Sequence, residues 1–170
     1  MKLDLRPIID VPGAKVDFHF PLDLREFPWD GPSPLDGPVE VKGAVRNRAG
    51  ALVLDAEMKT VLHLTCDRCT KAFVRDKSVK YETLLADRLE DENSDDIVLL
   101  EDDDSLDLDG LLTDVFILSL DSKNLCKEDC RGLCPGCGAD LNVEPCRCKK
   151  EIDPRWAKLA QLLEPEETDQ

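Results

Sequence analysis

The sequence predicts an α+β protein with an antiparallel, β-rich N-terminal domain, one central helix and a cysteine-rich C-terminal module that ends in a short helix. The first 85 residues repeatedly alternate apolar and polar side chains, the two-residue period of strands with one buried face. Apolar residues then recur at helical spacing after an acidic stretch. Six of the eight cysteines follow within residues 126–148. We therefore expect a domain over residues 1–122 and a module over residues 123–170.

The strand prediction is clearest in residues 52–64, where apolar side chains occupy one parity and charged side chains the other. This pattern is typical of a half-buried strand in an antiparallel sheet. Residues 71–85 are expected to return as another strand. The segment between them is then a hairpin tip, and it carries Cys66 and Cys69. Residues 28–38 are too rich in proline and glycine for a regular element, so we expect a loop there.

Two helices are expected. The first covers about residues 109–121, with Asp109 as its N-cap and apolar residues three and four positions apart. The second covers about residues 153–164, where Asp153 suits the N-cap and Pro154 the first helical position. Its apolar stripe consists of Trp156, Leu159, Ala160 and Leu163.

The charge of the chain is concentrated in one segment. Between residues 89 and 122 there are thirteen acids and no Lys or Arg, and without those acids the net charge of −15 falls to −2. We expect an acidic loop over residues 89–109. Such a segment repels nucleic acid and suits a basic protein partner, unless it is only a solvated loop. Its densest run, and the candidate contact for a basic partner, is Glu101, Asp102, Asp103 and Asp104.

Composition bounds the class of protein. The chain has 170 residues, 42% of them apolar, which is enough for a folded core. The start has no signal-type apolar run, and no stretch approaches a membrane span of roughly 18 apolar residues. We therefore expect a cytoplasmic protein without membrane association, in which thiols stay reduced. DNA is not an expected partner of so acidic a chain.

The eight cysteines are expected to bind metal. A CxxC pair on a turn brings two thiolates to one tetrahedral Zn²⁺, and a second pair completes the site. A redox-active CxxC usually lies at a helix N-terminus after a strand, whereas Cys66 and Cys69 are predicted between two strands. Eight thiols divide into two four-thiol sites, so we expect two zinc ions.

Spacing favours one partition of these ligands. Cys134, Cys137, Cys146 and Cys148 form a compact C-x2-C-x8-C-x-C knuckle whose loop closure costs little. The remaining Cys66, Cys69, Cys126 and Cys130 then tie the hairpin tip to the segment after the first helix. A zinc-ribbon pairing of the two CxxC motifs, Cys66 and Cys69 with Cys134 and Cys137, is the alternative.

No catalytic residues are predicted. Four thiolates leave no position on the zinc for water or substrate, and the sequence has neither a phosphate-binding glycine loop nor a GxSxG motif. Direct RNA contact beside the metal sites is a second hypothesis, because six cations lie within 29 residues there. These candidates are Lys127, Arg131, Arg147, Lys149, Lys150 and Arg155.

Several motifs together resemble a known family. They are CDRC followed by KAF, an acidic stretch, a leucine-rich segment leading into LCKEDCRGLCPGCGADLN and CRC, and finally DPRWAKLAQL. This arrangement resembles the YceD family, the large ribosomal RNA subunit accumulation proteins. The resemblance implies a role in the accumulation or processing of 23S rRNA, in bacteria and plastids. It also implies genomic association with a small zinc-ribbon protein of the large ribosomal subunit. Some relatives carry only the first CxxC, which favours a separate ion in the distal knuckle.

The expected function is therefore non-catalytic support of large-subunit biogenesis, through binding of the 23S rRNA precursor, a large-subunit ribosomal protein, or both. Two alternatives stay open. One is an RNA-processing enzyme or its subunit, which RNA cleavage with and without Mg²⁺ would detect. The other is a zinc-stabilised protein–protein adaptor unrelated to ribosomes, which crosslinking in cells would distinguish.

Overall fold

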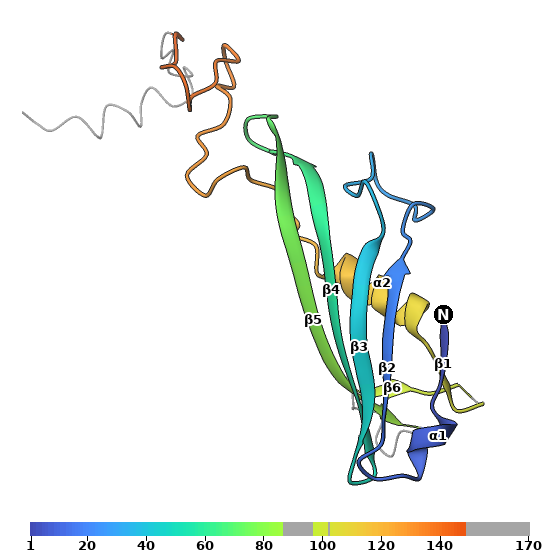
Figure 1. Ribbon diagram of the computed structural model, residues 1–170. Helices are drawn as coiled ribbons and strands as arrows, with labels where there is room; N and C mark the ends of the chain where they lie inside the picture. Colours follow the sequence, from blue (N-terminus) through green and yellow to red (C-terminus); the bar gives the residue numbers. More distant parts are fainter. Residues whose placement is uncertain (87–96, 102, 149–170) are drawn as a thin grey trace, which may run out of the picture. The chain divides into compact units, whose positions relative to one another are not determined.

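A five-stranded sheet organises the N-terminal part of the computed structural model (Figure 1). The structure describes residues 1–86, 97–101 and 103–148. The strand order is β2-β3-β4-β5-β6, and only the pairing of β5 with β6 is parallel. The mainly β class with few helices is thus confirmed. The strands of this sheet are β2 (Lys15–Leu22), β3 (Val39–Arg48), β4 (Ala51–Thr65), β5 (Ala72–Ala86) and β6 (Ile97–Leu99).

The hairpin of β4 and β5 is the longest feature of the sheet. The two strands pair in register from Leu52 opposite Leu85 to Thr65 opposite Ala72. The alternation predicted for residues 52–64 therefore forms a strand. The tip of this hairpin carries the CxxC motif, and Thr70 adopts a positive φ of 57° to close it.

The core lies on one face of this sheet. Alternate residues of β3 and β4, such as Val45 and Leu54, are fully buried there. The helix α2 (Leu108–Leu118) adds Leu112 and Phe116, also fully buried, to the same cluster. A short helix α1 (Arg6–Ile9) adds Ile8. Buried side chains three to four positions apart thus give α2 its apolar face.

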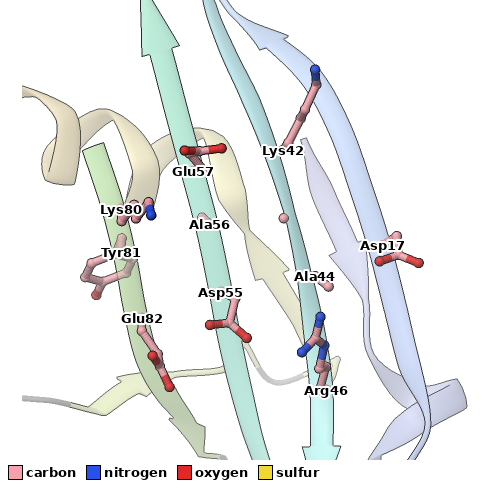
Figure 2. A pocket seen from close by; sticks show the side chains of 11 residues that line it. Asp17, Lys42, Ala44, Arg46, Asp55, Ala56, Glu57, Lys80, Tyr81 and Glu82 are labelled. Carbon is pink, nitrogen blue, oxygen red and sulfur yellow. The ribbon is translucent and has the colours of Figure 1, made fainter. Parts of the chain in front are cut away.

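The opposite face of the sheet is charged. Side chains from β2 to β5 surround a shallow depression of about 470 Å³ there (Figure 2). Acids and bases alternate across it, and Arg48 lies 3.7 Å from both Asp55 and Glu82. This mixture of paired, exposed charges is typical of a solvated sheet surface.

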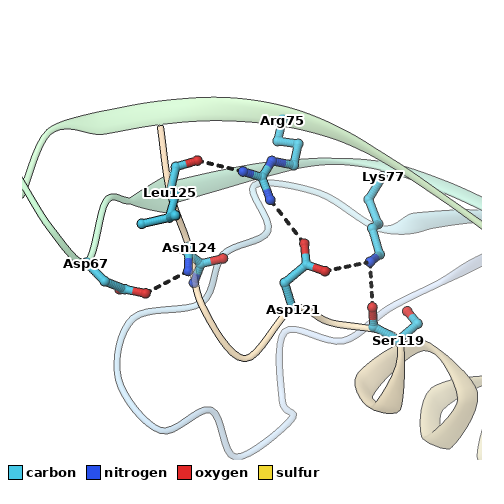
Figure 3. Close-up of polar contacts among 7 residues, drawn as sticks. All are labelled: Asp67, Arg75, Lys77, Ser119, Asp121, Asn124 and Leu125. Carbon is cyan, nitrogen blue, oxygen red and sulfur yellow. Dashed lines mark hydrogen bonds and ion pairs between the residues drawn. The ribbon is translucent and has the colours of Figure 1, made fainter. Parts of the chain in front are cut away.

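A polar layer holds the segment after α2 against β5 (Figure 3). Arg75 donates to Asp121 at 3.0 Å and to the Leu125 carbonyl at 2.7 Å. Lys77 donates to the carbonyl of Ser119. These two cations occupy inward-facing positions of β5, where charged side chains must find partners. They direct the chain toward the next cysteine, Cys126.

The acidic segment differs from the loop expected over residues 89–109. Its described part contains β6 and β7 (Ser105–Asp107), and β7 pairs with β1 (Lys2–Asp4). Leu106 is 3% exposed, so burial of one leucine explains why strand pairing reaches into so acidic a stretch. Residues 87–96 and 102 lie outside the described part of the chain.

The first predicted helix also differs in detail. The structure begins α2 at Leu108, with Asp107 rather than Asp109 at the N-cap position. Asp109 instead lies in the first turn, where its carboxylate favourably faces the helix dipole. The second helix, expected over about residues 153–164, lies outside the described residues.

The chain divides into two compact units. The first contains Met1–Asp67 and Lys71–Cys126, which hold all the strands and helices described above. The second contains Arg68–Thr70 and, within the described part, residues 127–148, built mainly of turns. Among the described residues, no helix has the length and apolar character needed to cross a membrane.

Candidate metal centres

The eight cysteines gather into two groups of four. We call Cys66, Cys69, Cys126 and Cys130 the hairpin cluster, and Cys134, Cys137, Cys146 and Cys148 the knuckle cluster. Within each group, all four sulfur atoms lie within 4.8 Å of one another. These are the two groups that sequence spacing favoured, and the zinc-ribbon pairing of the two CxxC motifs does not form.

The sulfur spacing suits a tetrahedral metal ion. Zn–S bonds of about 2.3 Å place tetrahedral sulfurs about 3.8 Å apart. In the knuckle cluster, Cys134 lies 3.2 Å from Cys146 and 3.7 Å from Cys148, while Cys137 lies 4.0 Å from Cys146. None of the eight cysteines forms a disulfide, and the sulfur separations in the knuckle cluster far exceed the S–S bond length of about 2.05 Å. Each cluster could therefore bind one metal ion through thiolates alone.

The hairpin cluster is largely buried. Cys66 is 0% exposed, Cys69 6% and Cys130 1%. The Cys66 amide donates to the Lys71 carbonyl at 2.9 Å, which closes the turn that carries the CxxC motif. Burial of several thiols in one place favours metal ligation, because unpaired thiolates would be strongly destabilised there.

The segment before Cys126 is held at the hairpin tip. Asn124 donates its amide to the Asp67 carboxylate at 2.6 Å, and Asp67 donates its own amide to the Asn124 carbonyl at 2.8 Å (Figure 3). This reciprocal pair positions Cys126 two residues later. Sequence reasoning missed this role, although Asp67 lies inside the quoted CDRC motif.

The middle of the CxxC motif is likewise anchored. Arg68 donates to the Cys130 carbonyl at 2.7 Å, and its own carbonyl accepts the Leu133 amide at 2.9 Å. Gly132 passes so close that an added Cβ would lie 2.8 Å from the Arg68 oxygen, and its φ is +75°. Only glycine suits both conditions. The glycine of CRGLC was the available signal for this contact.

The knuckle cluster is built by tight local turns. The Cys134 amide donates to the Ala139 carbonyl at 2.8 Å, and the Gly138 amide donates back to Cys134 at 2.9 Å. A Cβ at Gly136 would lie 2.7 Å from the sulfur of Cys148. Gly136 therefore leaves space for the Cys148 sulfur, whereas Gly132 leaves space for the Arg68 backbone. Three of the four knuckle cysteines are exposed.

The thiols of the knuckle cluster differ electrostatically. Backbone N–H groups of Cys137 and Gly136 lower the pKa of Cys134 to about 6. Crowding by the neighbouring thiols of Cys137 and Cys146 raises the pKa of Cys148 to about 12. The turn thus favours the ionised form of Cys134, whereas the neighbouring thiols disfavour the ionised form of Cys148. A bound divalent cation would favour the ionised form of all four cysteines.

Asn142 is a further residue that sequence reasoning missed. Its side-chain amide lies 3.5 Å from the sulfur of Cys130 and 2.7 Å from Asp140. Its oxygen accepts the Arg131 amide at 2.9 Å. An N–H donor beside a thiolate stabilises the negative charge of that thiolate. Asn142 would therefore stabilise Cys130 as a metal ligand without itself binding the metal.

The predicted RNA-contacting cations are only partly described. Lys127 lies 3.6 Å from Asp129, and Arg147 pairs with Glu144. The side chain of Arg131 is exposed. Lys149, Lys150 and Arg155 lie outside the described residues. Two of the three described cations are therefore already paired with acids of their own segment.

The predicted acidic contact is also engaged within the fold. Glu101 pairs with Lys2, and the carbonyl of Asp104 accepts the Leu5 amide at 3.1 Å. The Ser105 hydroxyl donates to Asp103 and holds the pKa of that carboxyl below its usual range. Asp102 is outside the described residues. The described residues of this run lie in a structured turn, in which Glu101 and Asp103 are exposed and Asp104 is half-buried.

Comparisons with known proteins agree with this site. The family of the large ribosomal RNA subunit accumulation protein YceD matches residues 54–163, a stretch that contains all eight cysteines. An uncharacterised protein of Mycobacterium tuberculosis is 45% identical over 64 residues, covering 38% of this chain and 31% of the relative. One from Mycobacterium leprae is 41% identical over 64 residues, covering 38% and 30%.

A plant relative is named for the same family. The chloroplastic large ribosomal RNA subunit accumulation protein YCED homolog 1 of Zea mays is 28% identical over 143 residues, covering 66% of this chain and 49% of the relative. This chain thus spans about a third of the mycobacterial relatives and half of the maize protein. No solved structure matches it. The family match over most of the chain confirms the resemblance seen in the cysteine motifs, and the protein belongs to the YceD family of large ribosomal RNA subunit accumulation proteins.

Proposed function

We propose that this protein is a non-catalytic factor for large ribosomal subunit biogenesis, which supports accumulation of 23S rRNA by binding a component of the immature subunit. The family match over residues 54–163 is the observation that carries this proposal. The proposal places the protein in the cytoplasm, where thiols remain reduced and available to metal. Its two metal ions are zinc, and their role is structural.

The donor sets support a structural role for the metal. Each cluster offers four thiols, and four thiolates saturate a tetrahedral zinc ion. Such a site has no open position for water or substrate. The metal instead stabilises the turns that carry the cysteines, because these turns contain few apolar side chains that could form a core. Cysteine ligands at all eight positions favour zinc over the hard, oxygen-seeking cations Mg²⁺ and Ca²⁺.

The charges favour a basic protein as the bound component. Four thiolates around one divalent ion retain two negative charges, so each metal site adds to the acidity of the chain. In the second unit, Lys127 and Arg147 lie beside Asp129 and Glu144. Phosphate binding requires cations that are not already paired with acids. In the acidic run, Glu101 is paired with Lys2, but the exposed Asp103 has no ion pair within the described residues and remains available to a basic surface. We therefore place a basic large-subunit ribosomal protein ahead of direct rRNA contact.

Complementation tests this function. Cells depleted of the protein should accumulate less large-subunit rRNA relative to small-subunit rRNA, and the intact chain should restore the ratio. A variant neutralised at residues 101–104 should restore it poorly if the acidic run binds a basic protein. A matched variant neutralised at four other exposed acids should restore it fully. These control acids are Asp17, Glu26, Asp30 and Glu40.

Purification from the same cells identifies the component. We expect a basic large-subunit protein to be retained with the intact chain after nuclease treatment, and to be lost from the variant neutralised at residues 101–104. If, without nuclease, both the intact chain and the variant retain rRNA, and neither retains a ribosomal protein after nuclease treatment, the contact would lie at the cations of the second unit. Cleavage of precursor RNA by the purified chain would contradict the non-catalytic role. Crosslinks only to non-ribosomal proteins would favour an unrelated adaptor.

A further inference from the structure

One edge of the sheet offers unpaired backbone groups. The strand β5 pairs with β4 along its length, but β6 covers its other edge only from Leu84 to Ala86. The Ala86 carbonyl accepts the Leu100 amide at 2.9 Å, so even-numbered residues of β5 direct their N–H and C=O groups to this edge. Among the described residues, no backbone group bonds the even positions from Val74 to Glu82.

The other edge of the sheet is protected. The Asn47 amide donates to the Ala14 carbonyl at 2.9 Å, so odd-numbered residues of β2 face outward. Pro21 occupies one of these outward positions and has no N–H to donate. Proline at such a position is a common protection against strand addition. The open stretch of β5 contains no proline and no glycine.

The open stretch is complementary to itself. It runs from Val74 to Glu82, so its centre is Ser78. Antiparallel pairing of two such stretches about a two-fold axis at Ser78 places Asp76 of one copy opposite Lys80 of the other, twice by symmetry. Both side chains are exposed, and no ion pair joins either one to the described residues, although Lys80 faces Glu57 of β4 across the strand pair. Opposite charges at directly facing positions stabilise a strand pair.

We propose that β5 is a homodimerisation edge, at which two copies of this chain join their sheets by antiparallel pairing of the residues from Val74 to Glu82. Each outward-facing residue then exchanges two main-chain hydrogen bonds with its counterpart. We take a second copy as the occupant because, among the antiparallel registers of this stretch with itself, this one places Asp76 opposite Lys80. Shifting the register by two residues would place Asp76 opposite Glu82, or Asp76 opposite Ser78.

Sedimentation of the purified, zinc-loaded full chain over a dilution series tests the proposal. We expect a monomer–dimer equilibrium. Asp76→Lys should raise the dissociation constant about tenfold or more, because it places two like-charged pairs in the interface. The double variant Asp76→Lys with Lys80→Asp should restore the dimer. A monomer at every concentration would overturn the proposal, as would a dimer indifferent to these charges.

Two further variants locate the interface. Ser78→Pro removes one outward N–H without removing a hydrogen bond to β4, so it should disrupt the dimer while circular dichroism stays unchanged. Asp17→Lys makes the same charge change as Asp76→Lys on the opposite edge strand, and it should leave the equilibrium unaltered. Loss of the dimer in Asp17→Lys would assign the contact to β2 and contradict the proposal.

Hydrogen exchange gives a test that needs no substitution. In the monomer, the outward amides of Asp76, Ser78 and Lys80 should exchange rapidly, since no described backbone group accepts them. In the dimer these amides should become protected as concentration rises, together with those of Val74 and Glu82. Concentration-dependent protection elsewhere, without protection here, would place the interface on another surface.

Discussion

The hairpin cluster and the knuckle cluster contain the same four thiols but differ in burial and in chain connectivity. Three hairpin cysteines are buried, whereas three knuckle cysteines are exposed. Fifty-six residues lie between Cys69 and Cys126, but only eight between Cys137 and Cys146. A cross-link that closes a longer loop removes more entropy from the unfolded chain. An ion bound in the hairpin cluster would therefore constrain segments that are distant in sequence, whereas an ion bound in the knuckle cluster would organise a local turn.

The largest expected effect is loss of the hairpin metal. Cys66→Ser should remove one of two bound zinc ions and lower the free energy of unfolding by about 3–5 kcal/mol, because buried thiolates would lose their counter-ion. Metal analysis and chemical denaturation measure the two effects. The matched variant Cys137→Ser should remove the other ion and leave the unfolding of the sheet nearly unchanged. If Cys66→Ser and Cys137→Ser remove the same single ion, the two clusters are not independent sites.

The second prediction concerns the rate of metal loss. A chelator should remove zinc from the full chain in two phases, the faster one from the exposed knuckle cluster. Three knuckle cysteines, Cys137, Cys146 and Cys148, are exposed, whereas three hairpin cysteines are buried and Cys126 is half-buried. A colorimetric chelator measures the phases, and Cys137→Ser should abolish the fast one. A single phase for both ions would mean that burial does not control release.

A smaller effect is expected from the glycines of the knuckle cluster. Gly136→Ala should weaken knuckle zinc binding, because the added methyl group meets the sulfur of Cys148 at 2.7 Å. The hairpin metal should be unaffected. Competition with a chelator measures the affinity of each site. Gly37→Ala is a control of the same chemistry, since nothing lies within 4 Å of its added Cβ. Equal affinity in both variants would show that the knuckle adjusts without cost.

The pH dependence of the metal-free chain should also separate the clusters. The folded pKa of Cys134 is about 6, below the ordinary value of 9.0. Its contribution to knuckle stability is therefore present at alkaline pH and is lost as pH falls through about 6. Ultraviolet thiolate absorbance should show one thiolate forming near that pH. Cys134→Ser should remove this step, and Cys69→Ser should leave it in place.

The smallest predicted effect is that of Asn142. Asn142→Ala should destabilise the hairpin cluster by about 1 kcal/mol, the usual contribution of one hydrogen bond, without releasing either ion. Its amide lies 3.5 Å from the sulfur of Cys130. Denaturation of the zinc-loaded chain measures this change. Release of zinc from Asn142→Ala would contradict this prediction, because it would show that metal binding requires Asn142.

The sequence predicted the local parts of this fold and the grouping of its thiols. The two-residue alternation from Leu52 to Leu64 identified a strand, because one face of that strand is buried. The alternation at residues 3–5 indicated a strand where β1 lies, but β6 and β7 were not predicted, since strands of three residues are too short to show a reliable period. Their pairing depends on distant neighbours, such as Leu3 opposite Leu106. Anchors such as Asn142 were missed for the same reason.

The separation of Cys69 from Cys126 has a consequence for synthesis of the chain. Translation at about 5–20 residues per second leaves Cys66 and Cys69 exposed as an incomplete site for roughly 3 to 10 s before Cys126 is made. The knuckle ligands, from Cys134 to Cys148, follow within roughly 1–3 s of one another. Cys66 and Cys69 therefore remain without their two other ligands for longer than the knuckle cysteines do. Zinc bound by these two thiols during that interval would protect them from oxidation.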